Sequence, residues 1–300
     1  MILLLTLALF LLTPLPHNVL NNVTETAAVF HEKCLSSVPT SSSHGSTLAS
    51  LVCGEKITDE TLKENLSRTS LIHIFVVSGS HLLLLDQLLS IFKIPLFVRF
   101  LLLGFYSLLV GWQAPVVRAF TTLALRAGLK NSFLSFPPDL VVLLGGLLGL
   151  VIFPAWWSSL SYQMSWCAGL ALSFTAILRL RRSWKQAVTA QLGIFVLMSA
   201  PLWGLGSLHP LSIVYNLILA PVVSYALLPL SLASLIHPVF LWCFDGVMGV
   251  FEELLFVIAE PIKIVRGPLP SSGFLWFWIF SIHLLLHFIR LRLWQGRDSK

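Results

Sequence analysis

The chain has 300 residues, of which 56% are hydrophobic and only 11% are charged, and its mean hydropathy is +0.87. Soluble domains carry about 25% charged residues, so this composition excludes an ordinary water-soluble globular protein. The formal net charge of +6 does not by itself indicate nucleic-acid binding, because Lys and Arg of membrane proteins gather in cytoplasmic loops. We therefore expect an all-α integral membrane protein, a polytopic helical bundle of about ten transmembrane or re-entrant helices.

The N-terminal third begins with an apolar run and continues into a polar segment. Residues 2–16 lack a basic start and a clear small-residue cleavage site, which favours a first transmembrane span or signal anchor (1–16) over a cleaved signal peptide. Residues 17–70 are polar and predict a short amphipathic helix that Thr58 or Asp59 caps. We expect this segment to form a small extracytoplasmic cap.

Two cysteines fall inside the polar segment. Cys34 and Cys53 would close a loop of about 20 residues, and disulfides persist only in oxidising compartments. A Cys34–Cys53 disulfide is therefore expected if residues 17–70 lie outside the cytoplasm. Two free thiols are the alternative.

Residues 71–300 hold a close series of apolar segments, which we interpret as a transmembrane channel domain. The predicted spans are 71–92, 94–112, 114–128, 138–153, 158–178, 186–204, 211–236, 239–259 and 273–289. The basic loop at 179–185 should be cytoplasmic by the positive-inside rule, and alternation from there places both termini in the cytoplasm. Only Lys263 and Arg266 fall on the wrong side. The expected location is a bacterial inner membrane.

Polar side chains at membrane depth are costly, so each is a functional candidate, with helix–helix hydrogen bonding as the alternative. A Ser-Gly-Ser break within an apolar helix is tolerated only beside protein or a water-filled cavity. The candidate lining residues are Ser78, Gly79, Ser80, His81, Gln113, Arg118, Gln163, Ser165, Asn216 and Pro221. Three further carboxylates, Asp245, Glu252 and Glu253, either line a channel or indicate that the 239–259 helix lies at an interface.

Common catalytic motifs are missing from the sequence. It has no GxxxxGK[ST] loop for ATP, no HExxH, no clustered His/Asp metal signature and no GxSxG elbow. We expect no enzymatic activity, no metal and no cofactor. An intramembrane hydrolase that uses Ser78 or Ser80 is a minor alternative, because its histidine would have to come from another span.

Four of these polar clusters, in their order, resemble the competence domain of the ComEC/Rec2 family of DNA-uptake channels. The segment from His73 to His81 is similar to that family's HLLAISGLH-like stretch, although Leu-Ile-His replaces its more usual Gly-x-x-His. The other matches are Pro115–Ala119 with a Pro/Ser-x-x-Arg-Ala element, Pro154–Trp166 with P-x-x-L…F-Q-L-S-F, and Asn216–Pro221 with N-L-x-x-x-P. The resemblance covers about residues 48–235.

The resemblance implies a channel that passes single-stranded DNA across the inner membrane during natural transformation. It also implies a cytoplasmic helicase-like motor, a periplasmic DNA receptor and membrane lipid as partners, with an oligomer left open. The OB-type and metallo-β-lactamase-like domains of longer members do not fit in this sequence, which looks like a channel-only member. Single strands are commonly held by cationic grooves and aromatic stacking, although most of the ten Trp residues suit the membrane interface better. A secondary transporter of another anionic or small solute is the alternative function.

Overall fold

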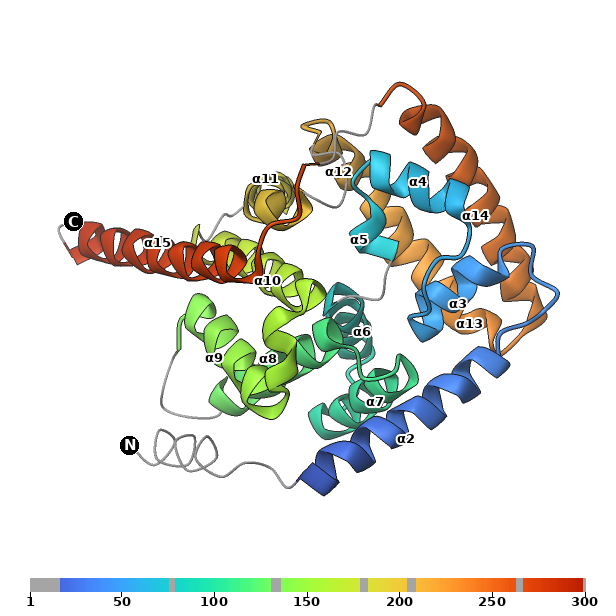
Figure 1. The fold of residues 1–300 in the computed structure, drawn as a ribbon, viewed down its shortest axis with the longest axis horizontal. Helices are drawn as coiled ribbons and strands as arrows, with labels where there is room; N and C mark the ends of the chain where they lie inside the picture. Colours follow the sequence, from blue (N-terminus) through green and yellow to red (C-terminus); the bar gives the residue numbers. More distant parts are fainter. Residues whose placement is uncertain are drawn as a thin grey trace.

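The computed structural model describes residues 17–75, 79–130, 136–178, 183–203, 209–262 and 267–298. Throughout these ranges the regular structure is helical, with no strand (Figure 1). The all-α prediction is therefore confirmed. Residues 1–16, including the predicted first span, lie outside the described part.

The polar N-terminal segment, which we call the cap, folds into three helices. They are α2 (His17–Ser36), α3 (Gly45–Cys53) and α4 (Glu60–Arg68). Asp59 caps α4 by accepting a hydrogen bond from the Leu62 backbone N–H at 3.0 Å, as one of the two predicted caps. Cys34 and Cys53 are joined by a disulfide, as the sequence predicted, and it ties α2 to the end of α3.

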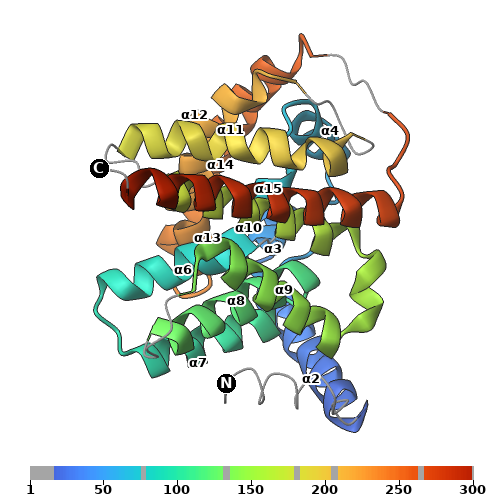
Figure 2. The same cartoon turned by 90° about the vertical axis from the view of Figure 1, so that its left-hand side faces the viewer.

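The predicted spans between 71 and 204, together with the last one, correspond to a helical bundle. Its elements are α5 (Ile72–Phe75), α6 (Gly79–Ile91), α7 (Leu96–Leu109), α8 (Ala114–Lys130), α9 (Pro138–Ile152), the 3-10 turn η1 (Pro154–Ser158), α10 (Leu160–Leu178), α11 (Ser183–Leu202) and α15 (Ser272–Asp298). α10 packs against α8, α9, α11 and α15 (Figure 2). α10 is thus the central helix of the bundle.

A long helical hairpin follows the bundle. Its first arm comprises α12 (Ser212–Val222), the π-helical turn η2 (Val223–Leu227) and α13 (Leu228–Ser234), and its second arm is α14 (Pro238–Ala259). The π turn follows Pro221, which lacks the N–H that an α-helical turn needs. In Figure 1, α14 runs across the plane of the view, whereas α11 is seen nearly end-on, so the two helices are steeply inclined.

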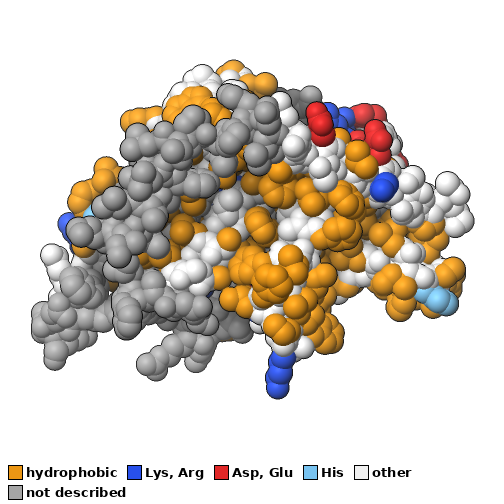
Figure 3. Space-filling model, turned by 90° about the horizontal axis from the view of Figure 1, so that it is seen from below, with side chains coloured by type: hydrophobic (Ala, Val, Ile, Leu, Met, Phe, Trp, Pro, Cys, Tyr) orange, Lys and Arg blue, Asp and Glu red, His pale blue; other side chains and the backbone are white. Residues whose placement is uncertain are grey.

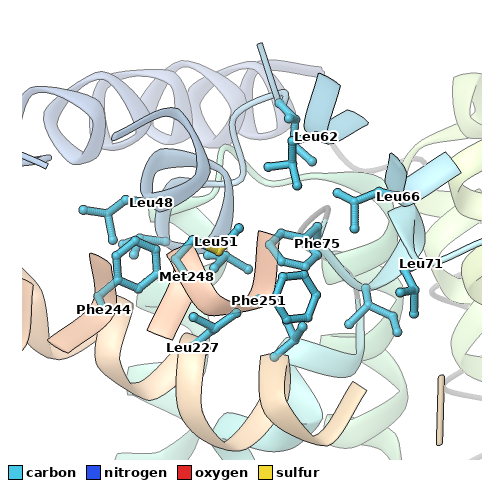
Figure 4. Close-up of a cluster of buried hydrophobic side chains, with 14 of the residues drawn as sticks. Leu48, Leu51, Leu62, Leu66, Leu71, Phe75, Leu227, Phe244, Met248 and Phe251 are labelled. Atoms are coloured by element: carbon cyan, nitrogen blue, oxygen red, sulfur yellow. The ribbon is translucent and has the colours of Figure 1, made fainter. Parts of the chain in front are cut away.

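The largest buried cluster, which we call the first core, joins the cap to this hairpin (Figure 4). Leu48 and Leu51 of α3 pack with Phe244 and Met248 of α14, and the Phe75 and Phe251 rings lie 5.2 Å apart. The first core therefore draws on both sides of the boundary predicted at residue 70.

Contacts at the helix ends agree with the predicted alternation of directions. The starts of α8 and α10 are joined by Ser165 and Pro115, and the starts of α10 and α15 by Gln163 and Ser272. At the opposite end, Arg290 late in α15 lies 3.5 Å from Asp139 at the start of α9. α9 therefore runs antiparallel to α8, α10 and α15.

Length and apolar composition single out two of the described helical stretches as able to cross a bilayer. These are Ser212–Ser234 and Ser272–Leu293, whereas Leu96–Leu109 and Pro138–Ile152 are apolar but shorter. The prediction of about ten crossing helices is not confirmed by this test. Large apolar side chains are nevertheless exposed over broad areas, as Figure 3 shows for one face. Such a surface is typical of a protein that contacts lipid.

Candidate functional site

Arg118 lies one turn into α8, where the described helices pack tightly. Its side chain is only 5% exposed, and its Nε donates a hydrogen bond to the Ser165 Oγ of α10 at 2.9 Å. Ser165 Oγ in turn donates to the Pro115 carbonyl at 3.4 Å. Pro115 stands in the first turn of α8, where its missing N–H leaves no helical hydrogen bond unmade.

At Gly79, the start of α6 lies against the contact between Pro115 of α8 and Ser165 of α10. A Cβ atom at Gly79 would lie 2.8 Å from Ala119 Cβ, 3.2 Å from the Pro115 carbonyl oxygen and 3.5 Å from Ser165 Oγ. Only glycine allows this approach without a shift of the helices. We call Gly79, Pro115, Arg118, Ala119 and Ser165 the Arg118 cluster. It unites residues from three of the four motifs that the sequence singled out.

The positive charge of Arg118 has no carboxylate partner among the described residues. Its Nη1 atom is buried and makes no hydrogen bond in that part of the chain. Its nearest neighbours include Gly169, whose added Cβ would lie 3.0 Å from Nη1, and the side chains of Tyr162 and Cys167. A buried guanidinium with a spare donor suits an anion, because Arg forms strong charge-assisted bonds to phosphate oxygens.

Gln163 lies on α10 like Ser165 but belongs to a different group of contacts. Its Nε2 donates to the Trp157 carbonyl at 3.1 Å and to Ser272 Oγ at 2.9 Å. The same carbonyl accepts from Ser272 Oγ at 3.0 Å and from Trp276 Nε1 at 2.7 Å. Gln163 therefore fastens α15 to the start of α10, and the structure does not bring it to the Arg118 cluster.

An aromatic group surrounds this junction. The Trp157 and Trp276 rings stack at 4.5 Å, and Trp166 packs edge-on against Trp276 at 5.2 Å. Trp166 Nε1 donates to His283 Nε2 at 2.8 Å. Trp166 is fully buried while Trp157 is half exposed, so only the rim of this group can meet a ligand or lipid headgroups.

Gln113 occupies the joint between cap and bundle. Its Nε2 donates to the Gly54 carbonyl at 2.7 Å, immediately after the cap disulfide. His31 of α2 contacts the Leu109 carbonyl in the same joint, with its Nδ1 at 3.3 Å. The intervening turn needs Gly111 and Trp112 at positive φ. Gln113 thus docks the cap onto the start of α8 in this structure, beside the Arg118 cluster rather than in it.

The remaining predicted residues are dispersed. His81 is buried in α6 beside the Ile74 backbone, while Ser80 is exposed. Asn216 is buried in α12, and its Oδ1 has no hydrogen-bond partner among the described residues, while Pro221 is exposed before the π turn. Ser78 lies outside the described residues. For all predicted lining residues, a role in DNA passage stays a prediction.

Sequence reasoning did not find a polar group between the cap and α14. His44 Nδ1 lies 3.3 Å from Asp245 Oδ1, and His44 Nε2 lies 3.4 Å from Glu252 Oε2. Beside it is a groove of about 420 Å³ between α4 and α14, with Asp59, Asn65 and Glu253 in its lining. His44 stands alone in a Ser/Thr-rich stretch, so no spacing pattern could have indicated it. Within the described ranges, no three His, Cys, Asp or Glu side chains are placed to hold a metal ion.

Comparison with known proteins identifies the class. Residues 51–295 match the model of the family described as "Competence protein", so the chain belongs to the competence protein family. It is similar to the uncharacterized protein MG316 of Mycoplasma genitalium, with 26% identity over 216 residues that cover 69% of this chain and 54% of that protein. The chain thus spans about half the length of that relative. No solved structure matches it.

Proposed function

We propose that this chain forms a multi-pass inner-membrane channel that passes single-stranded DNA into the cytoplasm during natural transformation, with both termini in the cytoplasm. Family membership supports a role in DNA uptake. The observation that carries the channel proposal is the Arg118 cluster. There, motifs far apart in the sequence place between three helices a buried cation that has no carboxylate partner in the described part of the chain.

Phosphate groups cannot pass through bare hydrocarbon, so a translocated strand needs cationic and polar groups along its path. In the proposed channel, Arg118 contacts the strand's phosphate oxygens through its spare Nη1 donor when the surrounding helices part. Ser165 fixes the guanidinium plane through Nε and leaves Nη1 for the ligand. The chain supplies passage and no catalysis. A cytoplasmic helicase-like motor pulls the strand, and a periplasmic receptor delivers it.

The test replaces Arg118 by Gln in a competent host and measures transformation with purified DNA. The matched control is Arg126→Gln, because Arg126 lies on the same helix but is exposed. We expect Arg118→Gln to lower transformation at least about tenfold at an unchanged level of protein in the membrane, since one charge-assisted phosphate contact is lost. Arg126→Gln should transform normally. Normal transformation by Arg118→Gln would refute the assigned role.

A secondary transporter is the second candidate. The unpartnered Oδ1 of buried Asn216 lies shortly before a π turn, an arrangement that occurs at solute sites. Purified protein in liposomes distinguishes the two candidates. Uptake of a small solute driven by an ion gradient, without any DNA, would favour the transporter.

A further inference from the structure

α14 carries three carboxylates near the middle of its 22 residues, which is unusual for a helix that crosses a bilayer. The face that bears Phe244, Met248 and Phe251 is buried in the first core. Asp245 and Glu252 lie at the edge of this face, against the cap. Asp245 and Glu252 are thus directed toward the cap and not toward the bundle.

The cap contacts α14 at several points along the helix. Near the start of α14, Ser42 Oγ donates to Asp245 Oδ1 at 2.7 Å, and His44 bridges Asp245 and Glu252. Farther along, α4 and α14 together line the groove that contains Asn65 and Phe256. At 1.5 Å per residue, the distance from Asp245 to Phe256 corresponds to roughly 16 Å along the helix axis.

Both parts of the cap that touch α14 carry exposed polar side chains. Ser43 is exposed beside the start of α14, and Glu60 and Lys63 are exposed on α4 beside its later half. Exposed charged segments of this kind do not lie in hydrocarbon. The cap touches α14 both near its start and in its later half. If α14 crossed the roughly 30 Å hydrocarbon layer, at least one of these two cap contacts would lie inside the lipid. α14 therefore stays at the level of the cap from its beginning to its end.

The opposite face of α14 is an exposed apolar stripe. Val239, Trp242, Val250 and Val257 are 56%, 78%, 68% and 66% exposed, and their spacing places them along one side of the helix. α14 contains no Lys or Arg, and Glu253 is the one carboxylate that interrupts the stripe. A helix with one polar edge and one apolar stripe typically lies in the plane of a membrane interface.

We propose that α14 lies along the membrane surface on the side of the cap, with its apolar stripe inserted at the boundary of headgroups and acyl chains, and does not cross the bilayer. The occupant of the stripe is lipid. α13 ends only four residues before α14 begins, so α13 also ends on the side of the cap. The crossing predicted at 239–259 is then absent.

Site-directed spin labelling tests this arrangement through depth. Trp242, Val250 and Val257 are replaced by Cys one at a time, in a chain with Cys243→Ser, and each variant carries a nitroxide. The labelled protein is placed in vesicles of phosphatidylcholine and phosphatidylglycerol at 3:1. Collision with oxygen and with a water-soluble nickel chelate gives each label's depth.

Matched labels at Phe277, Leu284 and Phe288 of α15 provide the control, because these positions are equally exposed on a helix long enough to cross. The α14 labels should share one shallow depth within about 5 Å, the height of one helical turn, whereas the α15 labels should differ by roughly 10 Å or more. Depths that change along α14 as they do along α15 would overturn the proposal. Protection of the α14 labels from both reagents would also overturn it, since a second protein copy would then cover the stripe.

This experiment does not depend on the proposed function, because it requires neither DNA nor a competent host. Each labelled side chain is exposed and Cys243 is partly exposed, so the substitutions should not disturb the fold. Membrane extraction and a thermal unfolding profile identify any variant that has not folded.

Discussion

The closest helix approach in the Arg118 cluster depends on the absence of one methyl group. Gly79→Ala would place a Cβ atom 2.8 Å from Ala119 Cβ and 3.2 Å from the Pro115 carbonyl oxygen. Neither neighbour can rotate away, because one is the first side-chain atom and the other is backbone. The start of α6 must therefore move from α8, and overpacking of this kind typically costs about 1–3 kcal/mol.

The matched control is Gly128→Ala on α8, the helix that Gly79 of α6 approaches, since an added Cβ at Gly128 would meet no described residue within 4 Å. Alanine is the better helix former by about 1 kcal/mol, so this control should be neutral or slightly stabilising. Thermal unfolding in detergent and transformation frequency are measured for both variants. We expect Gly79→Ala to lower both values. Unchanged unfolding and transformation for Gly79→Ala would show that α6 and α8 do not make this contact in the membrane.

Three further predictions concern the contacts around the bundle and the cap. Gln163→Met should lose two buried hydrogen bonds and about 1–3 kcal/mol of unfolding free energy, and unfolding in detergent checks this. Cys34→Ser should lower the unfolding free energy by about 3 kcal/mol, because the disulfide to Cys53 no longer closes its loop. Added reductant should destabilise the parent protein by a similar amount, and little destabilisation in both cases would contradict the prediction. His283→Leu should leave the buried Trp166 N–H unpaired at a cost of about 1–3 kcal/mol, whereas His283→Gln should keep most of the stability.

Several features were predictable because they depend on local chemistry. Bilayer-length apolar segments predicted most helix boundaries to within a few residues, and an Asp at the start of an amphipathic run predicted the cap of α4. Two cysteines within one polar segment predicted the disulfide. Each of these inferences requires only neighbouring residues in the chain.

The rest depends on which distant segments meet. Gln113, Arg118 and Gln163 look alike in sequence, as polar residues near helix starts. In the structure Gln113 contacts the cap, Arg118 lies with residues of α6 and α10, and Gln163 contacts α15. Periodicity also cannot distinguish a crossing helix from one that packs beside a polar cap. The carboxylates of α14 were recognised, but their partner His44 lies about 200 residues away without any pattern.

The shared first core has a consequence for the order in which the protein can be made. Phe75 and Phe251 are in contact although they lie about 175 residues apart in the chain. At about 5–20 residues per second of synthesis, the cap waits roughly 10–35 s for its partner helix to emerge. During that interval the leucines of α3 and α4 have no native surface to cover them. A newly made cap is therefore a natural client for a chaperone, and truncation before α14 should leave it open to proteolysis.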